Sequence, residues 1–180
     1  MSSSGMTVRL GTRDDLDSLV DLGLAAMPMD PQWDYRYPHR LEYPDEHRIC
    51  TRERWERFFR PDPSGGSPRD WNPRHVEAFR RAVRAASGEK FDSRYGEKQV
   101  HLQILGTHPY YQRRGAASAL LRYGIQQARE EKLPITLLAS PMGQPLYASF
   151  GFEDRGKVVV QVDGEEDKVT LDAMALEVAK

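Results

Sequence analysis

The chain has 180 residues, of which 39% are hydrophobic and 29% are charged, as in a soluble globular protein. Its 26 basic and 27 acidic residues leave a net charge of -1, which argues against a general attraction to nucleic acid. No apolar run is long enough to cross a bilayer, so we expect no membrane span. The length suits one hydrophobic core, and we expect a single domain over residues 1–180.

The N-terminal sequence and the cysteine content indicate the compartment. Met-Ser-Ser-Ser-Gly has neither the basic and apolar pattern of a secretory signal nor the arginine-rich pattern of a transit peptide. We therefore expect a cytoplasmic protein, with the nucleus as the alternative. Cys50 is the single cysteine, so no internal disulfide can form. No cysteine pair and no spaced group of His, Asp and Glu is evident, and we predict no metal.

The N-terminal third is expected to hold a short strand and two helices. Thr7–Leu10 is typical of a strand, and Thr12 followed by Asp15 predicts the start of a helix. The apolar face of that helix continues until Pro28, where a loop rich in aromatic residues begins. Thr51 is expected to cap the second helix.

The middle of the chain is predicted to be helical and poor in strands. Residues 61–72 form a linker-like loop rich in Pro, Gly and Ser, and Asn72 with Pro73 predicts the start of a third helix. Between Phe59 and Val100 we find no two alternating apolar runs that could form a hairpin. The sheet of this protein is therefore expected to be short.

The second half alternates strands and helices. The expected segments are a strand over Val100–Leu105, a helix beginning near Ala117, a strand over Ile135–Ala139, a helix near Gln144–Phe150, and a hairpin of strands near Val158–Val162 and Val169–Leu176. The first three make a βαβ unit, which pairs its strands in parallel. The expected regions are 1–60, 61–72, 73–98, 99–152 and 153–180, the fourth being the βαβ core and the last the hairpin.

The turn before the second-half helix has the residues that an anion site needs. The start of a helix offers unpaired backbone N–H groups and the positive end of the helix dipole. Gly115, Ala116 and Ala117 permit close approach there, and Arg113 and Arg114 add positive charge. A tight turn between strand and helix, without any ligand, would also explain these residues.

Two motifs in order carry a resemblance to a known family. Residues 102–117, LQILGTHPYYQRRGAA, resemble the GNAT acetyltransferase signature of an apolar strand, a proline and Arg/Gln-x-x-Gly-x-Gly/Ala. Residues 146–152, LYASFGF, resemble the Leu-Tyr-x-x-x-Gly-Phe segment of the same superfamily. The sequence is similar to GNAT-like proteins of filamentous fungi, with some resemblance to the arylalkylamine branch. It departs from the family pattern at Ala117, where a second glycine is commoner, and in the missing strand pair.

The resemblance implies an α/β fold with a mixed sheet, helices on both faces and acetyl-CoA as cosubstrate. It places the CoA pyrophosphate on the turn and helix start, and the thioester carbonyl near the end of the motif strand. The residues implied to hold the cosubstrate are Leu105, Gly106, Thr107, Gln112, Arg113, Arg114, Gly115, Ala116 and Ala117.

Two side chains are candidates for proton transfer. His101 precedes the motif, and an imidazole that titrates near neutral pH suits removal of a proton from an ammonium group. The arylalkylamine-type proteins resemble the chain here, but their second histidine is replaced by Gln103. Tyr147 matches the family tyrosine that gives a proton to the departing thiolate. A hydrogen-bonded structural histidine and a core tyrosine are the alternative interpretations.

The expected function is transfer of an acetyl group from acetyl-CoA to a primary amine of a small molecule. One alternative is a weakly active or inactive acyl-CoA-binding protein that acts by binding or self-association, and another is a fold that no longer binds CoA. The free edge of Val100–Leu105 could be covered by Thr7–Leu10, by residues 90–97 or by a second molecule, so a homodimer is also expected to be accessible.

Overall fold

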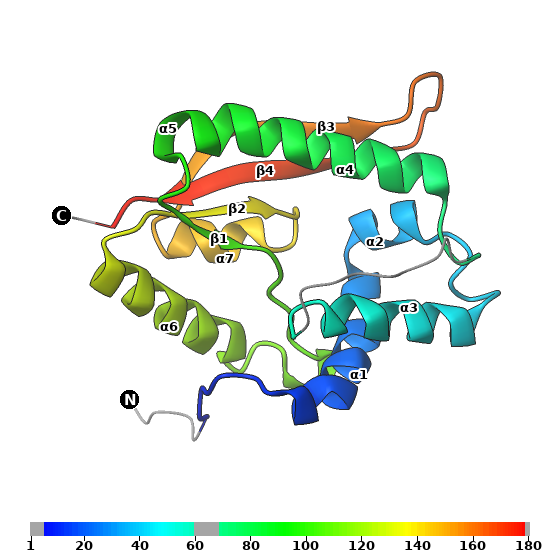
Figure 1. Ribbon diagram of the computed structural model, residues 1–180, viewed down its shortest axis with the longest axis horizontal. Helices are drawn as coiled ribbons and strands as arrows, with labels where there is room; N and C mark the ends of the chain where they lie inside the picture. The colour runs from blue at the N-terminus through cyan, green and yellow to red at the C-terminus, as the bar shows by residue number, and fades with distance from the viewer. Residues whose placement is uncertain (1–5, 60–68, 179–180) are drawn as a thin grey trace. The chain divides into compact units, whose positions relative to one another are not determined.

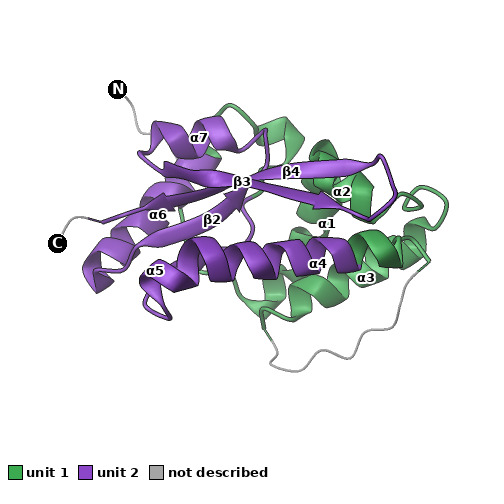
Figure 2. Ribbon diagram, turned by 90° about the horizontal axis from the view of Figure 1, so that it is seen from above, with its two compact units in different colours: residues 1–76, 106–116 green, residues 77–105, 117–180 purple. Residues whose placement is uncertain are grey.

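The computed structural model of the chain describes residues 6–59 and 69–178. They divide between two compact units, coloured separately in Figure 2. We call residues up to 76 together with 106–116 the helical unit, and residues 77–105 together with those from 117 onward the sheet unit. The proline- and glycine-rich loop expected from residue 61 lies largely outside the described residues.

The helical unit is built from short helices (Figure 1). They are η1 (Arg13–Asp15), α1 (Leu16–Ala26), η2 (Met27–Met29), α2 (Pro31–Arg36) and α3 (Pro44–Glu56). The predicted helix start is confirmed, because Thr12 and Asp15 form a capping box in which the Thr12 backbone N–H donates to the Asp15 carboxylate over 2.8 Å.

Two predictions for this unit are wrong. Thr7–Leu10 is not a strand; no described strand pairs with it, and an isolated strand has no ladder to stabilise it. Thr51 does not cap a helix, because α3 already begins at Pro44. Thr51 is instead 2% exposed, and its methyl group packs toward Gly23, where an added side chain would lie 2.9 Å from the Trp55 indole nitrogen.

A buried polar pair holds α3 to the segment after the undescribed loop. The His47 Nδ1 lies 2.5 Å from a carboxylate oxygen of Asp70, which is fully buried. The Trp33 indole N–H donates to His47 Nε2 over 3.3 Å. An indole N–H can only donate, so the Nε2 atom of His47 carries no proton and accepts this hydrogen bond. The proton of the ring is then on Nδ1, which donates to Asp70.

Substituting Asp70 is expected to destabilise the protein. Asp70→Ala leaves a buried ring N–H without an acceptor, which costs roughly 1–3 kcal/mol of unfolding free energy. Asp70→Asn keeps an acceptor oxygen and should cost much less. Urea unfolding of both variants measures the difference; equal losses would show that the hydrogen bond to His47 is not what stabilises this contact.

The sheet unit contains a four-stranded mixed sheet in the order β1-β2-β4-β3. Its strands are β1 (Val100–Leu102), β2 (Ile135–Ala139), β3 (Glu153–Gln161) and β4 (Lys168–Leu176). β1 pairs with β2 in parallel, and β4 is antiparallel to both β2 and β3. The predicted βαβ unit and the C-terminal hairpin are therefore confirmed.

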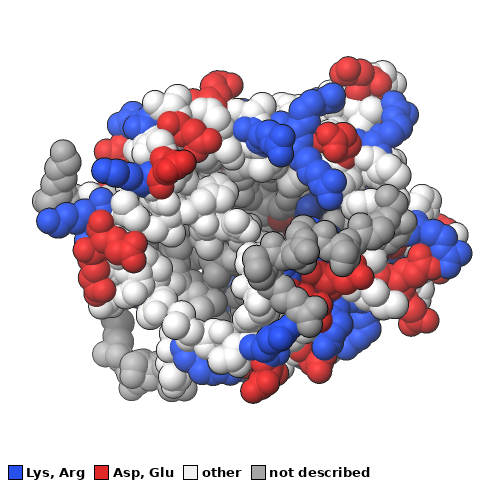
Figure 3. Space-filling model, in the orientation of Figure 1, with Lys and Arg blue, Asp and Glu red and all other residues white. Residues whose placement is uncertain are grey.

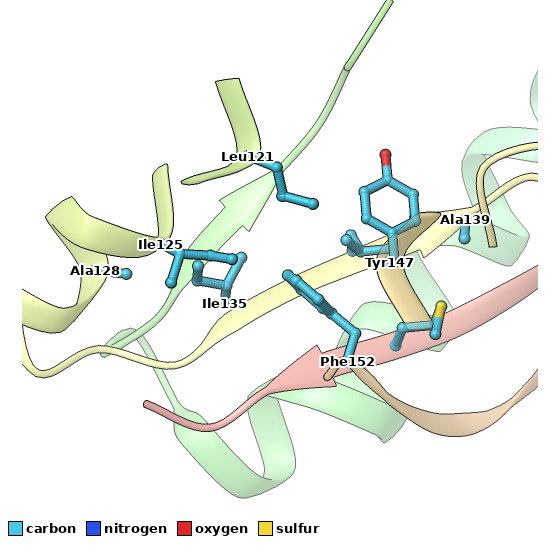
Figure 4. Close-up of a cluster of buried hydrophobic side chains, with 9 residues drawn as sticks. Leu121, Ile125, Ala128, Ile135, Ala139, Tyr147 and Phe152 are labelled. Atoms are coloured by element: carbon cyan, nitrogen blue, oxygen red, sulfur yellow. The ribbon is translucent and has the colours of Figure 1, made fainter. Parts of the chain in front are cut away.

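Helices cover both faces of this sheet, as the fold prediction requires. They are α4 (Pro73–Ser87), η3 (Gly88–Asp92), α5 (Ser93–Tyr95), α6 (Ala116–Glu131) and α7 (Gln144–Ser149). On one face α6 and α7 pack on β2 and β4 around Leu137, Ile125 and Phe152 (Figure 4). On the other face α4 and η3 pack on β3 and β4 around the fully buried Phe91.

The sheet is short, as expected. In the described residues the chain between α3 and β1 contributes α4, η3 and α5 and no strand, so β1 is an edge strand with one partner. The strand predicted over Val100–Leu105 is wrong in length, because β1 ends at Leu102. It leaves β2 there, although β2 continues from Leu137 to Ala139. None of the described helices is long and apolar enough to cross a membrane.

Candidate active site

The turn before α6 has an unusual backbone. A short helix, η4 (Pro109–Tyr111), is followed by a turn over residues 112–115 that enters α6 directly. Arg113 has φ 59° and Gly115 has φ 87°, so both residues lie in the left-handed region. Left-handed residues within a turn are one element of the backbone concavities that bind anions. The first N–H groups of α6, which have no partner within a helix, continue that surface.

Side chains of the helical unit fix the loop that leads into this turn. The Gln112 side-chain amide donates to the Thr107 carbonyl over 3.2 Å and to the Met29 sulfur over 3.3 Å. Gly106 permits the close approach of Met27, whose methyl carbon would lie 2.8 Å from an added Cβ. The Thr107 hydroxyl is buried and has no hydrogen-bond partner among the described residues. It is therefore a polar group that a ligand could satisfy.

Positive charge is available at the turn. Arg113 and Arg114 are exposed, and neither forms an ion pair with a described residue. The Arg114 guanidinium lies 5.7 Å from the centre of the Tyr111 ring. Elsewhere on the surface drawn in Figure 3, basic and acidic side chains are interspersed. The attraction for an anion is thus local to the turn rather than a property of a whole face.

His101 lies on the edge strand of the sheet unit. Its Nδ1 is 3.0 Å from the hydroxyl oxygen of Thr136, its partner in the β1–β2 register. The centre of the His101 ring is 5.9 Å from that of Phe91. The residue is exposed overall, yet the neighbouring side chains remove enough water from the ring to lower the pKa of His101, and Asp92 opposes this shift.

A cavity of about 390 Å³ opens beside this histidine, within the sheet unit. Its lining includes Phe91, Asp92, Glu97, Gln99 and His101. The two carboxylates favour a cation and the buried Phe91 lies beneath the cavity, so the cavity suits a small ammonium compound.

Tyr147 lies on α7, on the face of the sheet covered by α6. The residue is 8% exposed, and its ring meets the Phe152 ring edge-on with centres 5.7 Å apart. Gly143, the residue before α7, leaves room for this ring, since an added Cβ would lie 3.0 Å from it. Figure 4 shows the Tyr147 hydroxyl pointing away from the apolar side chains. The ring is part of the core while its polar end is directed out of it.

The structure groups the predicted site residues in two sets. His101, Leu105, Ala117 and Tyr147 belong to the sheet unit, where Leu105 and Tyr147 share one apolar cluster. The helical unit holds the remaining ones, which are Gly106, Thr107, Gln112, Arg113, Arg114, Gly115 and Ala116. The sequence reasoning missed Gln99 and Thr136. The register of two parallel strands could have identified Thr136 as the neighbour of His101.

A comparison with protein-family models tests the resemblance to GNAT acetyltransferases. Residues 92–177 match the model described as an acetyltransferase (GNAT) domain. The GNAT match is thus to the C-terminal half of the chain. This segment contains the strand of His101, the whole of the turn and α6, and the helix of Tyr147. GNAT acetyltransferases generally use acetyl-CoA. In the described residues no three His, Cys, Asp or Glu side chains are grouped so that they could hold a metal ion.

Known proteins agree with the GNAT assignment. A curated relative from the fungus Stachybotrys chartarum, named acetyltransferase, is 30% identical over 102 residues. The match takes in 57% of this chain and 42% of the relative, so the chain spans less than half of that protein's length. A crystal structure from Corynebacterium glutamicum, described as histone acetyltransferase HPA2 and related acetyltransferase, superposes with a TM-score of 0.60. It covers 94% of each chain at 20% identity, which confirms the GNAT fold.

Proposed function

We propose that this protein transfers the acetyl group of acetyl-CoA to a primary amine of a small molecule. The observation that carries the proposal is that one GNAT-matched segment contains the left-handed turn before α6 together with His101 and Tyr147. The turn supports binding of a diphosphate. His101 contacts Phe91 on the α4 face of the sheet and Tyr147 lies on the α6 face, so in this proposal the thioester passes the free edge of β1 and meets both side chains, which support the proton transfers of amide formation.

Acetyl-CoA fits the residues present at the turn. The positive φ of Gly115 and the exposed guanidinium groups of Arg113 and Arg114 suit the pyrophosphate, and the unpartnered hydroxyl of Thr107 offers a further polar contact. Ala116 and Ala117 contribute backbone N–H groups at the helix start. When bound, the thioester supplies an activated acetyl group whose leaving group is a thiolate.

The acceptor amine would occupy the cavity beside His101. Asp92 and Glu97 attract it as an ammonium ion, and His101 removes one proton to expose the nitrogen lone pair. As the C–N bond forms and the C–S bond breaks, Tyr147 gives a proton to the departing sulfur, and the second proton lost by the nitrogen returns through solvent to the Tyr147 oxygen. The product is an amide and free CoA.

The pH dependence of this reaction follows from the lowered pKa of His101. A base acts only when neutral, so kcat/KM should fall as the pH drops through the pKa of this histidine. Because desolvation lowers that pKa, the midpoint of the fall should lie below the ordinary value of about 6.5. His101→Gln should remove this acidic limb, whereas His39→Gln, an exposed histidine in the helical unit, should keep it. A limb that persists in His101→Gln would assign the base to another group.

Thiol release from acetyl-CoA with a panel of primary amines tests the function. We expect release that depends on the amine, an acetylated product by mass spectrometry, and higher rates for cationic amines that carry an apolar body. Binding of acetyl-CoA without turnover of any amine would instead support the acyl-CoA-binding alternative. The amines of the panel are chosen to match the charge and the apolar character of the cavity.

A further inference from the structure

A chain of hydrogen bonds leads from His101 through the buried Thr136 to Gln99, Asp92 and Gly96, which line the same cavity. His101 Nδ1 lies 3.0 Å from Thr136 Oγ1, which in turn lies 2.7 Å from Gln99 Oε1. The Gln99 side-chain nitrogen lies 2.9 Å from Asp92 Oδ1 and 2.8 Å from the Gly96 carbonyl oxygen. All five residues belong to the sheet unit.

We propose that Thr136 and Gln99 are positioning residues that hold the proton of neutral His101 on Nδ1 and leave the lone pair of Nε2 free. The tautomer is a property of these side chains alone. Its consequence for catalysis rests on the function proposed above, in which His101 takes a proton from the acceptor amine.

At the outer end of this chain of hydrogen bonds, the Gln99 amide has one allowed orientation. A backbone carbonyl and an ionised carboxylate can only accept hydrogen bonds. Both lie within hydrogen-bond distance of the same Gln99 atom, so that atom is the NH2 group. The Gln99 oxygen therefore faces Thr136.

The orientation of the Gln99 amide fixes the direction of the Thr136 hydroxyl proton. A hydroxyl has one proton to donate, and an amide oxygen can only accept, so Thr136 donates to Gln99. Thr136 is 0% exposed, which leaves it no water molecule as an alternative acceptor. What the hydroxyl presents to His101 is a lone pair, and the imidazole must place its N–H on Nδ1 to make this contact.

The other ring nitrogen is the one that can act as a base. With Nδ1 protonated, the neutral ring carries its lone pair on Nε2, and His101 lines the cavity proposed for the amine. An imidazole with the opposite tautomer would point its N–H group at the acceptor amine and could not remove a proton from that amine. The hydrogen bond made by one ring nitrogen sets which nitrogen carries the proton, and a histidine held in the wrong tautomer loses its power as a general base.

Nuclear magnetic resonance of the full chain tests the tautomer directly. In uniformly 15N-labelled protein, above the pH at which the ring titrates, long-range 1H–15N correlations of His101 should show the pattern of a proton on Nδ1. The spectrum of His101→Gln assigns the signals among the five histidines. In Thr136→Val the Nδ1 proton loses its acceptor, so the ring should shift toward the Nε2-protonated form, whose proton faces solvent.

Two further variants separate the tautomer from stability. Thr136→Ser restores the hydroxyl and should restore the Nδ1 pattern. Gln99→Met removes the acceptor of the Thr136 proton, so the hydroxyl can either donate to His101 Nδ1 or accept from it, and the variant should give a mixture of both tautomers. Thr170→Val, a threonine on β4 outside this chain of contacts, is the control for losing a strand hydroxyl and should leave His101 unchanged.

Activity gives a second measurement. Thr136→Val should lower kcat about 10-fold or more with KM for acetyl-CoA unchanged, and Thr136→Ser should recover most of the loss. An Nε2-protonated His101 in the unaltered protein, or an Nδ1 pattern that survives in Thr136→Val, overturns the inference whether or not amines are acetylated. The expected tautomers without any acetylation would support the inference and count against the proposed function.

Discussion

Gly115→Glu is expected to abolish binding of acetyl-CoA. Gly115 has φ 87°, a backbone region that residues with a side chain adopt only under strain. A carboxylate there also places negative charge where the pyrophosphate approaches the first N–H groups of α6. We expect affinity to fall by about 100-fold or more, which corresponds to about 2.7 kcal/mol. Equilibrium dialysis with labelled acetyl-CoA measures the loss.

Two variants control for strain and for charge in this experiment. Gly115→Asn has a residue that tolerates the left-handed region and adds no charge, so its affinity should lie between those of the unaltered protein and Gly115→Glu. Gly124→Glu adds the same charge further along α6, where an added Cβ meets nothing within 4 Å, and should bind normally. A folded Gly115→Glu protein with unchanged affinity would place the cosubstrate elsewhere.

Tyr147→Phe should lower kcat by about 100-fold, the effect of removing one proton donor from a transition state. The ring contacts in the apolar cluster stay, because phenylalanine keeps the edge-on contact with Phe152. The affinity for acetyl-CoA should therefore change little, since the lost interaction acts on the transition state rather than on the ground state. Steady-state kinetics together with the dialysis measurement separates kcat from binding.

The matched control for this variant is Tyr123→Phe. Tyr123 is a partly exposed tyrosine on α6, 38% of its surface being accessible, so removal of its hydroxyl should not affect turnover. Should Tyr147→Phe retain full kcat at every pH, the thiolate takes its proton from another donor or from water, and the hydroxyl direction seen in Figure 4 has no catalytic meaning.

The strands and helices that were predictable are those whose signal is local. Asn72 with Pro73 gives the start of α4, since the Asn72 side chain accepts from the Arg74 and His75 backbone over 3.0 and 3.3 Å. Ile135–Ala139 is apolar except for Thr136 and becomes β2 with the same bounds. Such signals depend on neighbouring residues only, so no knowledge of the fold is needed to read them.

The errors concern segments whose structure depends on distant partners. Thr7–Leu10 has strand-forming residues, but a strand exists only where another one pairs with it. The strand from Val100 should have continued to Leu105 by composition, yet its ladder ends where β1 leaves β2. Thr51 resembles a cap, whereas its burial inside α3 is decided by packing against α1.

The candidate site shows the same division. Gly115 could be predicted, because a glycine in a tight turn before a helix indicates a backbone that other residues adopt only under strain. Its positive φ confirms this. Within the relay, Thr136 could have been found from the pairing of the two predicted strands, whereas its contact with Gln99 joins side chains 37 positions apart in sequence and could not. The roles of His101 and Tyr147 remain predictions that the experiments above address.

The most direct test of the account is a calorimetric titration of the unaltered chain with acetyl-CoA. We predict saturable binding at one site, competition by free CoA, and loss of the heat signal in Gly115→Glu but not in Gly124→Glu. A titration of folded protein that shows no saturable heat at any concentration up to the millimolar range, roughly a binding free energy weaker than -4.1 kcal/mol, would contradict the cosubstrate site and with it the proposed acetyl transfer.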